Sequence, residues 1–256
     1  MARLTPAQRH FARKSAEQLV MKPRDMGKTD SRTYSPGEAA TAYELQLAEL
    51  DTDLRALKGV QAIDRKIALK RELIEKYDPW VGGVLDAVAA GGKATQDDIV
   101  LHMMMWALDI GDHDRALSTV SFVLDHDLAL PERFTRTAPT FIAEVSADNA
   151  LARLQQGEDC DLDWLTFVAD ATADKDMLDP VRAKLCKAIG LALGRKAEAM
   201  EAGDNGPAGG KAAALAAAVA QLKQALRLNS AVGVKKEIER LERLLKAAPP
   251  AQDGKD

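Results

Sequence analysis

The chain has 256 residues, of which 46% are hydrophobic, 29% are charged and only 4% are aromatic. This length can bury the core of one large domain or two smaller ones, and few aromatic residues among many alanines favour packed helices over a β-sandwich. No apolar run approaches the ~18 residues that span a bilayer, and the first ten residues hold no apolar signal core, so we expect a protein that is neither secreted nor membrane-bound.

Positive charge is concentrated at the start of the chain. Residues 1–36 hold eight Lys or Arg against three acids, a net charge of +5, whereas the whole chain carries −4. A basic N-terminal arm on an acidic body is typical of proteins that bind a polyanion. Thr5-Pro6 predicts a helix that ends near Met21, and the Pro-, Gly- and Ser-containing stretch after it predicts a flexible linker. The predicted phosphate contacts are Arg3, Arg9, Arg13, Lys14, Lys22, Arg24, Lys28 and Arg32.

Residues 37–78 predict one long amphipathic helix, because apolar residues recur there at intervals of three and four. The register slips after Leu57, and the apolar stripe then continues toward Ile74. A helix of this length would extend for about 60 Å, so we expect it to join subunits through a coiled-coil-like seam. The alternative is that it lies along the core of its own chain. The predicted seam consists of Tyr43, Leu47, Leu50, Leu54, Leu57, Val60, Ile63 and Ile67.

The rest of the chain predicts further helices, and no segment shows convincing period-two alternation, so the expected fold class is all-α. We expect residues 79–200 to form an acidic helical domain, 201–210 a linker, 211–247 a C-terminal helical hairpin, and 248–256 a frayed tail. Residues 78–210 carry a net charge of −12, and residues 211–246 carry +5. The spacing in residues 111–117 resembles a tetratricopeptide-type (TPR-like) hairpin, which predicts a bundle of helical hairpins.

No complete catalytic motif is visible. The stretch 87–94 lacks the first glycine and the final hydroxyl of a phosphate-binding loop, which argues against an ATPase. Two Asp-His-Asp triplets, at residues 112–114 and 125–127, flank one short predicted helix. They would lie roughly 15 Å apart, so helix capping explains them better than a shared metal site. If the chain were a metal-dependent nuclease using Mg²⁺, its weak candidates would be Asp109, Asp112, His113 and Asp114; otherwise we expect no cofactor.

An ordered series of motifs along the chain supports a resemblance to a known family. The motifs are Thr5-Pro6-Ala7-Gln8-Arg9-His10, Lys70-Arg71-Glu72-Leu73, Pro79-Trp80-Val81, Gln96-Asp97-Asp98-Ile99, Val181-Arg182-Ala183-Lys184-Leu185 and Val234-Lys235-Lys236-Glu237-Ile238. In this series the chain resembles the small terminase subunits, often labelled terminase endonuclease subunits, of Peduovirus-type tailed phages.

The resemblance implies a DNA-packaging role in the cytoplasm of the host bacterium. Such a subunit would bind the cohesive-end region of double-stranded phage DNA, assemble as a homo-oligomeric ring, and recruit and regulate a large ATPase subunit. Members of this family can carry a strongly basic C-terminal tail, and residues 248–256 contain no basic run. We therefore expect residues 1–36 to make the DNA contacts. Two alternatives stay open: an endonuclease that itself cuts cohesive-end DNA, and a helical scaffold that binds only protein.

Overall fold

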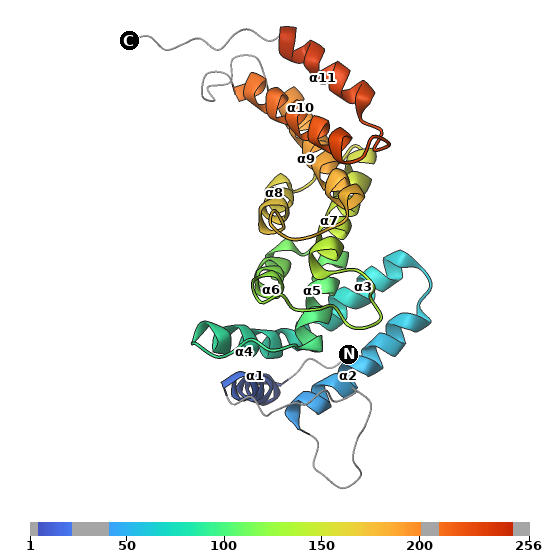
Figure 1. Cartoon of the computed structure of the whole chain (residues 1–256). Coiled ribbons are helices and arrows are strands. Elements are labelled where there is room, and N and C mark those ends of the chain that lie inside the picture. The colour runs from blue at the N-terminus through green and yellow to red at the C-terminus, as the bar shows by residue number, and fades with distance from the viewer. Residues whose placement is uncertain (1–4, 22–40, 201–209, 248–256) are drawn as a thin grey trace. The chain divides into compact units, whose positions relative to one another are not determined.

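The structure is a computed structural model that describes residues 5–21, 41–200 and 210–247 (Figure 1). Every regular element in these ranges is a helix, so the predicted all-α class is confirmed. None of the described helices is both long and apolar enough to cross a membrane. The linkers predicted after residue 21 and over 201–210, and the predicted tail at 248–256, lie outside the described residues apart from Gly210, which begins a helix.

The chain divides into two compact units, residues 1–135 and 136–256. The boundary falls inside the segment 79–200. The helices of the first unit are α1 (Pro6–Met21), α2 (Ala42–Gly59), α3 (Ile63–Ile74), the 3₁₀ turn η1 (Glu75–Tyr77), α4 (Asp78–Ala89), α5 (Asp98–Ile110) and α6 (His113–Asp125). Helix α5 forms the centre of this unit, because all of its residues from Ile99 to Leu108 are buried and it contacts α2, α3, α4 and α6.

The prediction of one continuous helix over residues 37–78 is wrong, because the described part of this segment contains two helices. Helix α2 is capped by Thr41, whose side chain forms a reciprocal capping box with Glu44, and it ends at Gly59. Val60 and Ala62 then take extended backbone angles, and α3 turns back to pack beside α5 (Figure 1). The break follows Leu57, where the apolar stripe loses its register, because two shorter helices can both turn apolar residues toward the core of their own unit.

The second unit contains α7 (Ala138–Gln155), α8 (Leu162–Ala171), α9 (Asp179–Ala199), α10 (Gly210–Leu228) and α11 (Lys235–Ala247). Helix α9 packs against α7, α8 and α10, and α11 packs against α10. At Gly190 an added Cβ would lie 2.7 Å from the Leu222 side chain, so α9 and α10 approach closely at this point. The predicted C-terminal hairpin corresponds to α10 and α11, whereas the coiled-coil seam and the TPR-type arrangement stay predictions.

Candidate nucleic-acid interface

Helix α1, which carries the described part of the basic arm, is packed on α4. Ala12 and Ala16 of α1 are buried, and Gly83 of α4 lies directly against Ala16 and the α1 backbone. A Cβ added at Gly83 would lie only 2.4 Å from the carbonyl oxygen of Arg13. The two helices therefore touch backbone to backbone, and the outer face of α1 is fixed relative to α4.

The outer face of α1 carries cations, two of which form ion pairs with nearby acids. Arg9, Arg13 and Lys14 are exposed. Arg13 forms ion pairs with Asp86 of α4 and with Glu17, and Lys14 also pairs with Glu17. The hydrogen bond from Lys14 holds the pKa of the Glu17 carboxyl below its usual range. Exposed ion pairs of this kind contribute little to the free energy of folding. A phosphate could therefore replace the Asp86 or Glu17 carboxylate as the partner of these cations at a small cost in stability.

Five of the predicted phosphate contacts cannot be placed, because they lie outside the described residues. They are Arg3, Lys22, Arg24, Lys28 and Arg32.

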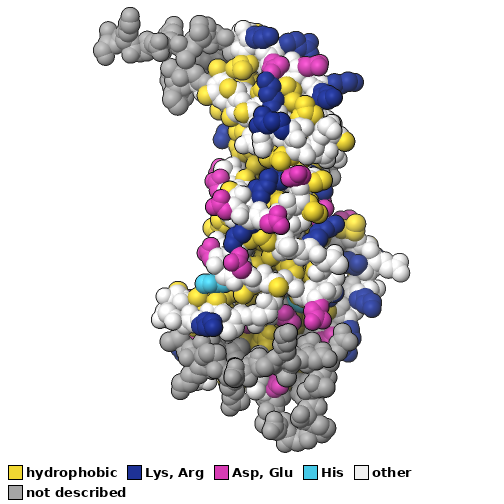
Figure 2. All heavy atoms as spheres, in the orientation of Figure 1, with side chains coloured by type: hydrophobic (Ala, Val, Ile, Leu, Met, Phe, Trp, Pro, Cys, Tyr) yellow, Lys and Arg dark blue, Asp and Glu magenta, His cyan; other side chains and the backbone are white. Residues whose placement is uncertain are grey.

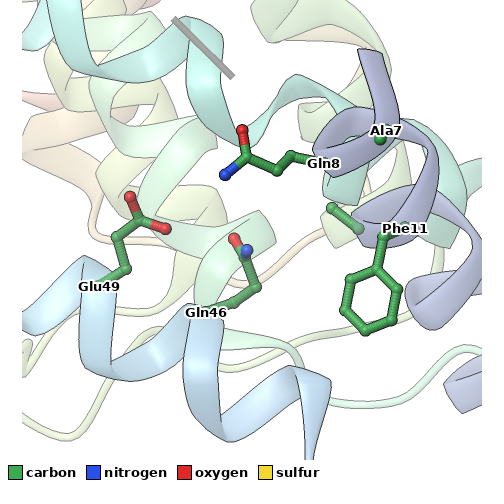
Figure 3. Close-up of a pocket in the computed structure, with 6 residues that line it drawn as sticks. Ala7, Gln8, Phe11, Gln46 and Glu49 are labelled. Carbon is green, nitrogen blue, oxygen red and sulfur yellow. The ribbon is translucent and has the colours of Figure 1, made fainter. Parts of the chain in front are cut away.

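A hollow of about 350 Å³ lies between α1 and α2 (Figure 3). In Figure 3 the polar ends of Gln8, Gln46 and Glu49 surround its open space, while Phe11 stands at its edge and is 63% exposed. The lining contains one carboxylate and no cation, so it does not suit a phosphate. Arg9, Arg13 and Lys14 of α1 are exposed and do not line this hollow. The lining residues are Ala7, Gln8, Phe11, Ala12, Gln46 and Glu49.

The four candidate catalytic residues lie at the turn between α5 and α6. Asp109 forms an ion pair with Lys70 of α3. Asp112 caps α6 by accepting a hydrogen bond from the backbone N–H of Arg115 at 3.1 Å, and it also pairs with the Arg115 guanidinium. His113 is half-buried and Asp114 is exposed in the first turn of α6.

The carboxylates of Asp109 and Asp112 thus serve to pair cations and to cap a helix. Arg115 also donates two hydrogen bonds to Asp78, at 3.0 and 2.8 Å, and these bonds raise the pKa of its guanidinium. Within the part of the chain that the structure describes, no group of three His, Cys, Asp or Glu side chains is arranged to hold a metal ion.

The predicted oligomerisation residues are partly buried within their own unit. Leu50 and Leu57 are buried, and Tyr43 stacks on Trp80 of α4 with ring centroids 5.7 Å apart. Ile63, next to the break between α2 and α3, is 73% exposed. The structure therefore leaves only part of the predicted seam available to another molecule. The half-buried members of the seam are Leu47, Leu54, Val60 and Ile67.

Comparison with known proteins identifies the family. The phage small terminase subunit family matches residues 47–180. The chain is 40% identical over 248 residues to "Terminase, endonuclease subunit" of Escherichia phage P2, which covers 97% of this chain and 88% of that protein. It is 25% identical over 216 residues to "Probable terminase, endonuclease subunit" of Haemophilus phage HP1, covering 82% and 73% respectively. No solved structure matches the chain. The sequence and its similarity to these phage proteins show that the chain belongs to the phage small terminase subunit family.

Proposed function

We propose that this small terminase subunit binds the cohesive-end region of double-stranded phage DNA and recruits and regulates the large ATPase subunit of the packaging motor. It would do so as a homo-oligomer in the cytoplasm of the infected host. DNA binding is supported above all by the packing of α1. Its backbone lies against Gly83 of α4, and its cations are exposed to solvent. Exposed apolar surface near Ile63 supports self-association through α2 and α3.

DNA binding through α1 should depend on salt, because each phosphate neutralised by Lys or Arg releases counterions. Replacing Arg9, Arg13 and Lys14 with Gln is expected to weaken binding at every salt concentration. It should also reduce the slope of log affinity against log salt by about 3, since each lost phosphate contact removes roughly 0.9. Fluorescence anisotropy of a labelled duplex carrying a cohesive-end sequence measures both quantities.

A matched control removes three exposed cations elsewhere in the same unit, by changing Arg55, Lys58 and Arg65 to Gln. An equal loss in both variants would assign the effect to overall charge and not to α1. The native mass of the same preparation should be measured first, since a mass equal to one chain would contradict the proposed oligomer. A parent protein that binds no DNA at low salt would favour the protein-only scaffold.

The second candidate function is a metal-dependent endonuclease, and the names of both phage relatives favour it. Its candidate residues, Asp109, Asp112, His113 and Asp114, would act with Mg²⁺. Because Asp109 is paired with Lys70 and Asp112 with Arg115, we expect the purified chain to leave cognate DNA uncut when Mg²⁺ or Mn²⁺ is added without the large subunit.

If the purified chain does cut cognate DNA, and Asp112→Ser abolishes that cutting, the endonuclease becomes the preferred function. Serine can keep the cap of α6 but supplies no carboxylate, so this variant separates chemistry from folding.

A further inference from the structure

Four cations of α9, α10 and α11 form ion pairs with acids. Figure 2 shows Lys and Arg side chains over α10 and α11, at the top of the view. Several of the basic side chains of these three helices lie within 3 Å of a carboxylate oxygen. The pairs are Lys184 with Asp148 at 2.9 Å, Arg195 with Asp159 at 2.7 Å, Lys223 with Glu242 at 2.7 Å and Arg240 with Glu237 at 2.7 Å.

Four other cations form no ion pair with a described acid and lie close to the loop between α10 and α11. They are Lys187, Arg227, Lys235 and Lys236, and we call these four residues the basic end. The Lys187 ammonium donates a hydrogen bond to the carbonyl oxygen of Val232 at 2.9 Å. Arg227 donates to the neutral amide of Gln224 at 3.0 Å. Lys235 and Lys236 are exposed and form no ion pair or side-chain hydrogen bond with a described residue.

The packing of the three helices brings these four residues to the same end of the bundle. The close approach of Gly190 to Leu222 sets α9 against α10, so that Lys187 lies near the last turn of α10, which contains Arg227. The Lys187–Val232 hydrogen bond then holds the loop that leads into α11. Positive charge from three helices therefore meets at the loop between α10 and α11.

The two lysines of α11 stand at the end of the helix where cations are least favourable. Unpaired backbone N–H groups give a helix N-terminus a partial positive charge, so Lys235 and Lys236 add repulsion there, although Glu237 in the same turn offsets part of it. By contrast, Lys196 and Lys246 occupy the last turns of α9 and α11, where cations are stabilising. An anion bound at the start of α11 would relieve the repulsion and would also accept hydrogen bonds from the first-turn N–H groups.

The surroundings of the basic end suit a phosphate backbone better than a protein surface. The adjoining loop, Asn229, Ser230, Ala231, Val232 and Gly233, contains no aromatic side chain, and its one larger apolar residue, Val232, packs against the core of the unit. Stable protein interfaces usually have an apolar or aromatic centre, whereas phosphates are held by Lys, Arg, Asn, Ser and backbone N–H groups.

We propose that the basic end binds the phosphate backbone of duplex DNA, as a second contact in addition to α1. This inference rests on the proposed function, because it assumes that the subunit engages DNA at all. A patch of four cations, of which Arg227, Lys235 and Lys236 are exposed, supplies affinity without reading sequence, so the basic end would strengthen binding to any duplex to a similar extent.

The test uses the full chain and two double variants with the same change in charge. Lys235→Gln with Lys236→Gln removes two cations of the basic end, and Lys196→Gln with Lys246→Gln removes two exposed cations from the last turns of α9 and α11. Anisotropy with cohesive-end and unrelated duplexes should show a loss of about tenfold at ~0.1 M salt for the first variant, and a salt slope smaller by about 2. The second variant should bind within about twofold of the parent, as expected for cations that touch no phosphate.

Thermal unfolding of the same proteins separates binding from folding. Because the helix dipole disfavours Lys235 and Lys236 but favours Lys196 and Lys246, the first variant should unfold at the same or a higher temperature than the parent, and the second at the same or a lower temperature.

A first variant that binds DNA as tightly as the parent would overturn the assignment of the basic end. If that variant kept its DNA affinity and instead lost association with the large subunit, the basic end would be a protein contact and the inference would be wrong. Failure of the parent itself to bind either duplex at low salt would overturn the DNA-binding proposal as a whole.

Discussion

Gly83→Ala is expected to displace α1 from α4 and to lower the free energy of unfolding, whereas Gly82→Ala is expected to leave it unchanged or raise it. A Cβ at Gly83 would lie 2.4 Å from the Arg13 carbonyl oxygen and 3.0 Å from the Ala16 Cβ. A backbone atom cannot move aside as a flexible side chain can, so the helices must separate, at a cost of about 1–3 kcal/mol. A Cβ at Gly82 meets no atom within 4 Å, and alanine is favoured over glycine inside a helix by up to ~1 kcal/mol.

Urea unfolding followed by circular dichroism measures this difference between two neighbouring glycines of one helix. Limited trypsin digestion should in addition cleave the Gly83→Ala protein faster at Arg9, Arg13 and Lys14, because α1 would be released from its support. If both variants were equally stable and equally resistant to trypsin, the close contact between α1 and α4 would be wrong.

The same pair of variants connects the packing of α1 to DNA binding. Gly83→Ala removes no charge, yet it frees the helix that presents Arg9, Arg13 and Lys14. Weaker DNA binding by this variant alone would show that the fixed position of these cations matters as well as their charge. Unchanged binding would mean that a mobile arm serves equally well, as expected for contacts made only to phosphates.

Local signals in the sequence were sufficient to predict the helical class and several helix starts. Thr5-Pro6 predicted the start of α1, and the prediction that Asp112 caps a helix agrees with its hydrogen bond to the Arg115 N–H. The break at Val60–Ala62 was harder to predict, because none of these residues is a strong helix breaker. The slip in the apolar register after Leu57 was the available signal, and packing against α5 decides how the chain responds to it.

Ion pairing between distant residues could not be predicted from the sequence. Arg13 is paired with Asp86, 73 residues away, and Lys70 with Asp109, 39 residues away. These pairs change how each candidate site is understood, because the pairing with Asp86 reduces the unopposed charge of α1 and Lys70 occupies one candidate metal ligand. The +5 charge of residues 211–246 was visible from the sequence. Only the structure separates Lys223, which is paired with Glu242, from Lys235 and Lys236, which pair with none of the acids that the structure describes.

Asp97→Ala is expected to destabilise the first unit more than the loss of an ordinary helix cap. The buried Asp97 carboxylate accepts hydrogen bonds from the backbone N–H groups of Ile99 and Val100, at 2.8 and 3.0 Å, and from the Trp80 indole at 2.9 Å. Alanine would leave three buried donors without an acceptor. At about 1–3 kcal/mol for each unsatisfied group, the total loss should reach roughly 3–5 kcal/mol.

Asp161→Ala provides the comparison for this substitution. Asp161 caps α8 by accepting a hydrogen bond from the Trp164 N–H at 2.9 Å, but its side chain is exposed, so its loss should cost only about 1 kcal/mol. Equal losses in chemical denaturation of the two variants would contradict a special role for Asp97 in joining α4 to α5.

The charge of Asp97 should also make stability depend on pH in the direction opposite to that of most carboxylates. Burial raises the pKa of this carboxyl above its ordinary value of 3.8, although the hydrogen bond from Trp80 and the two backbone N–H groups oppose the shift. Between the ordinary and the raised pKa, the folded protein holds a proton that the unfolded chain has lost, so the contribution of Asp97 to stability falls as pH rises. Asp97→Asn cannot titrate, and the stability advantage of the parent over this variant should therefore shrink as pH increases from about 4 toward neutrality. An advantage that grows with pH would mean that the three donors outweigh burial and that Asp97 is held as a carboxylate.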